Sequence, residues 1–174
     1  EDSNHTLNVY CKDALGNAGS IDSELFRVDT TPPIINKTVI GPQIGDYIKD
    51  WTDGDGTTIH VEATDNNIYG CAVNNVRCEW FYTVDGGGKI KGSDDITPPF
   101  DIKFYEDSNH TFTIKCWDKL GNKVNDTETF LVDSTPPVTT KTYGTPTKVE
   151  GDYRWITSST PITLNVTDPV INGC

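Results

Sequence analysis

Asparagine-linked glycosylation is the chemistry that the sequence supports most directly. The acceptor pattern Asn-x-Ser/Thr, without proline in the middle, occurs at Asn4, Asn36, Asn109, Asn125 and Asn165. Asn4 and Asn109 share the sequence SNHT, which we interpret as an exposed polar loop. Asn165 alternates with Leu164 and Val166, so its side chain should face solvent in a strand. These sites predict N-linked glycans, provided that the protein is exported.

Cysteines are the second group with predictable chemistry, because disulfides are expected in an acidic, exported chain. Cys11 and Cys116 occupy matching sequence contexts, and so do Cys71 and Cys174. Three pairings stay open: Cys71–Cys78 would close a short ring, Cys78–Cys116 would join adjacent strands, and Cys71–Cys116 would tie two sheets together. Zinc is not indicated, because Cys-x-x-Cys spacing is absent.

Calcium is a candidate ligand, since it prefers the carboxylate and carbonyl oxygens found at the joints of rigid β-repeat arrays. The candidate aspartates fall near expected strand ends: Asp65, Asp118 and Asp133, with Asp13, Asp29 and Asp168 at equivalent positions of a repeat. Asp65 and Asp118 should lie at the same end of the fold. The alternative is that these aspartates only form turns.

A second calcium candidate is the stretch DWTDGDGTT, which is similar to a D-x-D-G loop through Asp53, Asp55 and Gly56. Trp51, however, occupies the place where the first ligand should be. The matching stretch WITSSTPIT has no carboxylates, which favours a simple turn.

Catalysis is not indicated by any side-chain pattern. The histidines are His5, His60 and His110, and we interpret all of them as surface residues. No Cys/His or Ser/His/Asp arrangement accompanies them, and no glycine-rich phosphate loop is present. We therefore expect no enzymatic activity.

The charge of the chain argues against two classes of partner. The formal net charge is -12 and the pI about 4.4. Nucleic-acid backbones and anionic membrane surfaces both attract Lys-rich and Arg-rich proteins. No apolar stretch reaches the ~18 residues needed to span a bilayer. We expect neither nucleic-acid binding nor direct membrane insertion in this segment.

A long internal repeat organises the elements that carry these residues. EDSNHTLNVYCKDALGN at 1–17 returns as EDSNHTFTIKCWDKLGN at 106–122. FRVDTTPPI at 26–34 returns as FLVDSTPPV at 130–138. The period of about 104 residues is the size of one independent β-domain in an array.

The repeat predicts where domains begin and end. TTIHVEATDNNIYGC at 57–71 returns more loosely as TPITLNVTDPVINGC at 160–174. We therefore expect residues 1–30 to be the last strands of one unit, 31–134 to be a complete unit, and 135–174 to be the first strands of a third. With no initiator Met, the sequence is interpreted as part of a longer protein.

Short alternating segments predict that every unit is built from strands. Ile59, Val61 and Ala63 alternate with polar residues in TTIHVEATD, and Phe112 and Ile114 do so in TFTIKCWD. Paired prolines in DTTPP and DSTPP end a strand and form stiff linkers. No stretch has a helical period, so we expect an all-β fold.

Three motifs resemble the immunoglobulin-like repeats of large prokaryotic cell-surface proteins, those of archaea among them. They are the VD-T/S-T-PP joint, the strand ending in C-x-D-x-L-G-N, and the central W-x-Y-T-V-D-G-G strand. The resemblance covers essentially the whole chain. It implies tandem seven-stranded β-sandwiches used as a stalk, adhesin or filament building block.

The leading hypothesis is therefore a structural repeat of an extracellular, cell-surface protein. Its expected partners are neighbouring repeats of the array, other copies in a filament, and N-linked glycans. The alternative is a carbohydrate-binding or ligand-binding accessory module of a secreted enzyme, in which Trp117 would stack on a sugar. Lys12 replaces Trp117 in the other copy, which favours the structural hypothesis.

Overall fold

The fold is all-β, as the alternating pattern predicts. A computed structural model describes residues 2–65 and 75–170, and within these ranges it contains strands and no helix. More than half of the described residues lie in strands. The part of the chain that is described therefore offers no helix long and apolar enough to cross a membrane.

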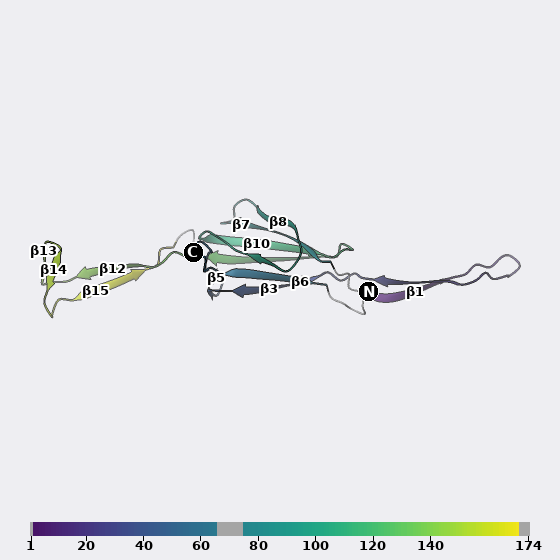
Figure 1. The fold of residues 1–174 in the computed structure, drawn as a ribbon, viewed down its shortest axis with the longest axis horizontal. Helices are drawn as coiled ribbons and strands as arrows, with labels where there is room; N and C mark the ends of the chain where they lie inside the picture. The colour runs from purple at the N-terminus through teal and green to yellow at the C-terminus, as the bar shows by residue number, and fades with distance from the viewer. Residues whose placement is uncertain (1, 66–74, 171–174) are drawn as a thin grey trace.

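Two sheets form the central part of the molecule, between residues 34 and 132 (Figure 1). The larger sheet has the order β4 (Gln43–Ile44), β5 (Tyr47–Ile48), β11 (Lys123–Val132), β10 (Ser108–Trp117), β7 (Arg77–Val84) and β8 (Ile90–Ile96). The smaller sheet has the order β3 (Ile34–Ile40), β6 (Thr58–Thr64) and β9 (Phe100–Ile102). All neighbouring strands are antiparallel except β5 and β11.

The core lies between these sheets and follows the predicted alternation. Ile59 and Val61 of β6 face Phe112 and Ile114 of β10, and none of these side chains is exposed to solvent. The outward residues of β10 are only partly covered, because the other face of the larger sheet is open. This arrangement is sandwich-like, with one apolar layer between two sheets.

One ion-pair cluster closes an edge of the sandwich. Lys37 of β3 lies on the inner side of its strand, and its ammonium contacts the carboxylates of Asp126, at 2.8 Å, and Glu128 on β11. The same ammonium lies 5.2 Å from the centre of the Phe112 ring. Lys37 thus connects the two sheets where no backbone hydrogen bond joins them.

Two-stranded antiparallel sheets lie beyond the two ends of the sandwich (Figure 1). They are β1 (Ser3–Val9) with β2 (Asp22–Val28), β12 (Val138–Tyr143) with β15 (Ile162–Thr167), and β13 (Thr147–Glu150) with β14 (Tyr153–Ile156). Leu7, the counterpart of Phe112, is 50 % exposed, because no second sheet covers this hairpin among the described residues.

Two of these strand pairs, β1–β2 and β12–β15, reproduce strand registers of the sandwich. Ser3 pairs with Val28 as Ser108 pairs with Val132. In the same way, β12 and β15 pair in the register of β3 and β6. The sequence repeat is therefore also a repeat of hairpin structure.

The interpretation of the SNHT stretch as an exposed loop is wrong for both copies, since Ser3 already lies in β1. The expected surface position of its histidine holds for His5 and is wrong for the copy at 108–111. Strand β10 already begins at Ser108, and Asn109 is half-buried within it. His110 is 0 % exposed and packs on Phe104, with ring centres 4.1 Å apart. The reason is strand parity, because His110 is in phase with Phe112. His60, by contrast, faces outward and contacts Asp101 at 2.7 Å.

Candidate functional site at the joint

An aspartate clamp holds each Pro-Pro linker, and we call the linkers 29–33 and 133–137 the first and the second joint. At the second joint, Asp107 Oδ1 accepts hydrogen bonds from the backbone N–H and the hydroxyl of Ser134, at 2.9 and 2.8 Å. The hydroxyl of Thr135 donates to Asp107 Oδ2. The start of β10 is thereby tied to the residues that follow β11.

The same clamp occurs at the first joint, one repeat earlier in the chain. Asp2 Oδ1 accepts from the N–H and the hydroxyl of Thr30, both at 2.7 Å, and Thr31 donates its hydroxyl to Asp2 Oδ2. Asp2 and Asp107 were not predicted from the sequence as functional residues. The signal was available, because both stand in the repeated EDSNHT segment, whose polarity suggested only a loop.

The clamp predicts a loss of stability in acid. Burial raises the pKa of Asp107, but hydrogen bonds from Thr135 and Ser134 outweigh it, so this pKa lies below its ordinary value of 3.8. A carboxyl with a lowered pKa stabilises the fold fully above the ordinary value, and its contribution disappears as the pH falls through the lowered pKa. The urea midpoint of the native chain should therefore drop more than that of Asp107→Asn between about pH 5 and pH 2.

Urea unfolding followed by tryptophan fluorescence across this pH range checks the expectation. Asp53→Asn serves as the control, because Asp53 lies on an exposed loop. Parallel pH profiles for the native chain and Asp107→Asn would contradict the role of the ionised clamp.

Three further aspartates gather where the first joint meets the sandwich. Asp29 belongs to the joint, Asp65 directly follows β6, and Asp118 directly follows β10. One carboxylate oxygen from each lies within 4.8 Å of the other two. Asp29 is 8 % exposed and Asp118 is 1 % exposed. The structure therefore brings Asp65 and Asp118 to the same end of the sandwich and adds Asp29 from the linker.

A tight turn fixes the carboxylate of Asp118. Its Oδ1 accepts from the N–H groups of Gly121 and Asn122, at 2.7 and 2.9 Å, and its Oδ2 accepts from Asn122 Nδ2 at 2.7 Å. Asn122 Nδ2 also donates to the carbonyl of Asp29 at 3.3 Å. Gly121 has a φ of 91°, a conformation that glycine adopts without strain. The turn therefore positions Asp118 and connects it to the joint.

The electrostatics of this cluster are unbalanced. Asp29 Oδ1 accepts from the N–H of Thr31 at 3.2 Å, whereas Asp29 Oδ2 is buried without a hydrogen-bond partner. Among the described residues, no Lys, Arg or His forms an ion pair with Asp29 or Asp118. Burying like charges without a cation is unfavourable. The site is thus suited to a positively charged ligand.

The other calcium candidates are not part of this cluster. Asp133 belongs to the second joint, at the opposite end of β11, where it accepts from the N–H of Thr135 at 2.9 Å. Asp168 is exposed after β15. Asp55 forms an ion pair with Lys49 at 2.6 Å, and Asp53 is exposed on the same loop.

Gly56 explains the loop sequence around Asp53 and Asp55 without a metal ion. A Cβ atom at position 56 would lie 1.9 Å from the carbonyl oxygen of Asp50. Glycine is therefore required where the backbone folds back on itself, which accounts for the DGDG sequence as turn chemistry.

The cysteines adopt one of the three pairings that the sequence leaves open. Cys78 of β7 and Cys116 of β10 are opposite each other and form a disulfide between adjacent strands of one sheet. This bond excludes the other two pairings, since each would use one of these residues. Cys11 is exposed and free. Cys71 and Cys174 lie outside the described residues.

The five sequons differ in accessibility. Asn4, Asn36, Asn125 and Asn165 are exposed on strands, whereas Asn109 is half-buried in the middle of the larger sheet. Asn109 had been expected among the most accessible sites, and its neighbours on β7 and β11 explain the difference. Asn36 and Asn125 are the most open acceptors within the sandwich.

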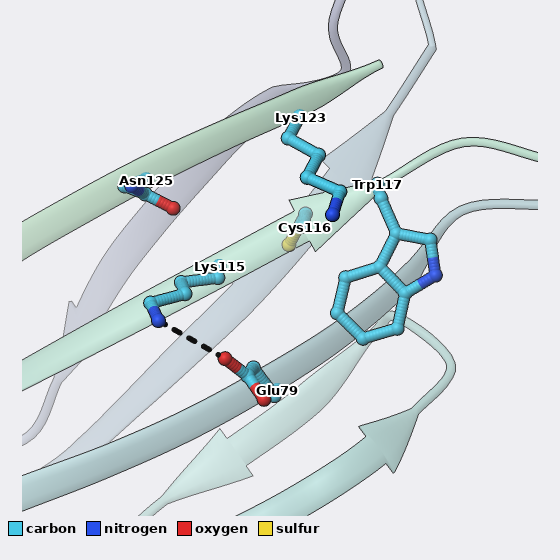
Figure 2. A pocket seen from close by; sticks show the side chains of 6 residues that line it. All are labelled: Glu79, Lys115, Cys116, Trp117, Lys123 and Asn125. Atoms are coloured by element: carbon cyan, nitrogen blue, oxygen red, sulfur yellow. Dashed lines mark ion pairs between the residues drawn. The ribbon is translucent and has the colours of Figure 1, made fainter. Parts of the chain in front are cut away.

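A shallow pocket of about 430 Å³ lies on the open face of the larger sheet (Figure 2). Lys115 contacts Glu79 at 3.2 Å across its floor, and the indole of Trp117 lies at one end. Asn125 lines the same pocket, so a glycan on this residue would cover it. The pocket combines one aromatic ring with charged groups.

No protein-family model, curated protein or solved structure matches the chain. We therefore infer function from the repeat, the joints and the side-chain geometry.

Proposed function

We propose that the chain is a structural segment of an extracellular surface protein, built from immunoglobulin-like units joined end to end. The observation that most directly supports this proposal is the aspartate clamp at each joint. Asp2 and Asp107 make the same hydrogen bonds to linkers of the same sequence pattern, one repeat apart. A fixed joint that recurs with the period of the repeat is what a stalk or filament requires.

Strand order supports the immunoglobulin-like part of the proposal. One sheet contains β3, β6 and β9, and the other contains β11, β10, β7 and β8 in adjacent positions. Immunoglobulin-like sandwiches divide consecutive strands between two sheets in this manner. The Cys78–Cys116 bond is a departure, since it lies within one sheet and not between the two.

Joint chemistry supports a role in holding units in line. Two consecutive prolines restrict φ in each linker, and the clamp removes further freedom by tying Ser134 and Thr135 to Asp107. Stiff linkers of this kind transmit the orientation of one unit to the next. We propose that the array works as a spacer that holds another part of the protein away from the cell.

Export is supported by the disulfide and the exposed sequons. We expect glycopeptide mapping of material from the native source to find sugar on Asn36 and Asn125, because both are exposed on outer strand surfaces. Occupancy on Asn4 and Asn109 stays a prediction from the sequence, with Asn109 the less accessible. Surface labelling of intact cells should detect the protein, with Cys78–Cys116 oxidised.

Two results would overturn the extracellular assignment. One is native material in which all five asparagines are bare and Cys78 and Cys116 are reduced. The other is a protein that resists labelling on intact cells but is labelled after lysis.

A second candidate function, carbohydrate binding, is favoured by the Trp117 pocket. This candidate function depends on a single aromatic ring, and a glycan on Asn125 would cover the pocket. Glycan-array binding that is lost in Trp117→Ala but retained in Trp155→Ala, on exposed β14, would move this candidate ahead of the structural role.

A further inference from the structure

We propose that Asp29, Asp65 and Asp118 bind one calcium ion, which fixes the linker of one unit against the sandwich of the next. The purpose of the ion depends on the proposed function, because stiffening a joint matters only in an array. Ion binding itself depends on the side chains at this joint and can be tested separately.

The spacing of the carboxylates fits a single ion. Calcium binds oxygen at about 2.3–2.6 Å, so two oxygens on the same ion lie at most about 5.2 Å apart. One oxygen from each aspartate falls within 4.8 Å of the others. The three side chains can therefore contact one ion with little movement.

Asp29 gives a second, independent indication of a cation site. This residue is more than nine-tenths buried, and its Oδ2 has no hydrogen-bond partner. Asp118 is buried beside it, and neither has a cationic partner among the described residues. A bound cation would satisfy Asp29 Oδ2 and remove the repulsion between the carboxylates.

The donor set favours calcium over other common cations. All three ligands are carboxylates, whereas zinc sites usually contain cysteine or histidine. Magnesium demands near-ideal octahedral geometry at about 2.0–2.1 Å and retains several waters. Calcium accepts irregular geometry and completes its six to eight ligands with water and carbonyl oxygens. Side chains from three separate segments provide such an irregular set.

The repeat gives a matched control within the same chain. Asp133 is the counterpart of Asp29 and makes the same bond to the following linker threonine. Asp13 is the counterpart of Asp118, and its carboxylate caps an equivalent turn through Leu15 and Asn17. Neither control residue belongs to the three-carboxylate cluster.

Calorimetric titration of the full 174-residue chain with calcium chloride, after treatment with a chelator, tests the proposal. We expect one binding site in the native chain, retained in Asp133→Asn and Asp13→Asn. In Asp29→Asn and Asp118→Asn the affinity should fall at least tenfold. Asparagine in place of Asp118 keeps an oxygen that can accept from the N–H groups of Gly121 and Asn122, and it loses only the bond from Asn122 Nδ2.

Thermal unfolding provides a second readout, because calcium should reverse the sign of the difference in melting temperature between Asp29→Asn and the native chain. Without calcium, Asp29→Asn should melt above the native chain, because one buried charge is removed. With calcium the order should reverse, whereas Asp133→Asn should show no reversal. Absence of calcium binding by the native chain, tighter binding of magnesium, or equal binding by native and Asp29→Asn chains would overturn the proposal. Each of these outcomes leaves the spacer function intact, since that function is tested by the shape of the molecule.

Discussion

Replacing Cys78 and Cys116 together by alanine is expected to lower the free energy of unfolding of the sandwich by about 4 kcal/mol. The bond joins residues 38 positions apart, and closing a loop of this length removes much of the entropy of the unfolded chain. Both residues are fully buried, so their replacement also loses apolar contacts. Because small domains are stable by only about 5–15 kcal/mol, the loss should be a large fraction of the total.

Urea unfolding without reductant measures this loss. Cys11→Ala is the matched control, because Cys11 occupies the same repeat position as Cys116 but is exposed and free. We expect the control to stay within about 0.5 kcal/mol of the native chain. A double variant as stable as the control would show that the disulfide does not stabilise the sandwich.

Truncating Phe112 to alanine is the second change with a large expected effect, about 3–5 kcal/mol of unfolding free energy. The ring is fully buried at the centre of β10, and its centre lies 5.8 Å from that of Phe130. Removing it leaves a cavity between the sheets and takes away the ring beneath the Lys37 ammonium. Closely packed cores do not collapse fully around such cavities.

Leu7→Ala is the control for Phe112→Ala, because Leu7 is the same repeat position in a half-exposed hairpin. It should change the unfolding free energy by less than about 1 kcal/mol. Tryptophan fluorescence can follow the unfolding of both variants, since Trp80 packs against the core of the sandwich. Equal losses for the two variants would contradict the assignment of Phe112 to the centre of the core.

The alternation of apolar and polar residues predicted the strands well, because each sheet of the sandwich buries one face. Ile59, Val61, Phe112 and Ile114 could be assigned inward from period two alone. His110 has the same phase, but the polar neighbours in EDSNHT suggested that the strand starts later. His110 lies two residues before Phe112, so continuing the same alternation toward the start of the strand would have placed this histidine in the core.

The composition of the acidic cluster was predictable only in part. Because successive strands reverse direction, β6 and β10 run the same way in the two sheets and finish at the same end of the sandwich, so Asp65 and Asp118 could be placed together from sequence. Asp29 joins them because Ile34, at the start of β3, pairs with Thr64 and brings the linker to that end. The sequence identified Asp29 only as a copy of Asp133, since no pattern shows which joint lies at which end.

The cysteine pairing could not be derived from the sequence, because it depends on strand register. Cys78 and Cys116 face each other only when β7 and β10 align as they do, and a shift of one residue would turn one side chain to the other face. Three pairings therefore remained equivalent until the register was known.

Small-angle X-ray scattering of the full chain tests most directly whether the units are held end to end. A compact protein of this length has a radius of gyration of about 16 Å. The clamped joints predict a value well above this, together with a distance distribution that has the long tail of a rod. Asp107→Asn should broaden that distribution, because it loses the charge that holds the second joint. A radius of gyration near the compact value would contradict the account of this chain as an extended array.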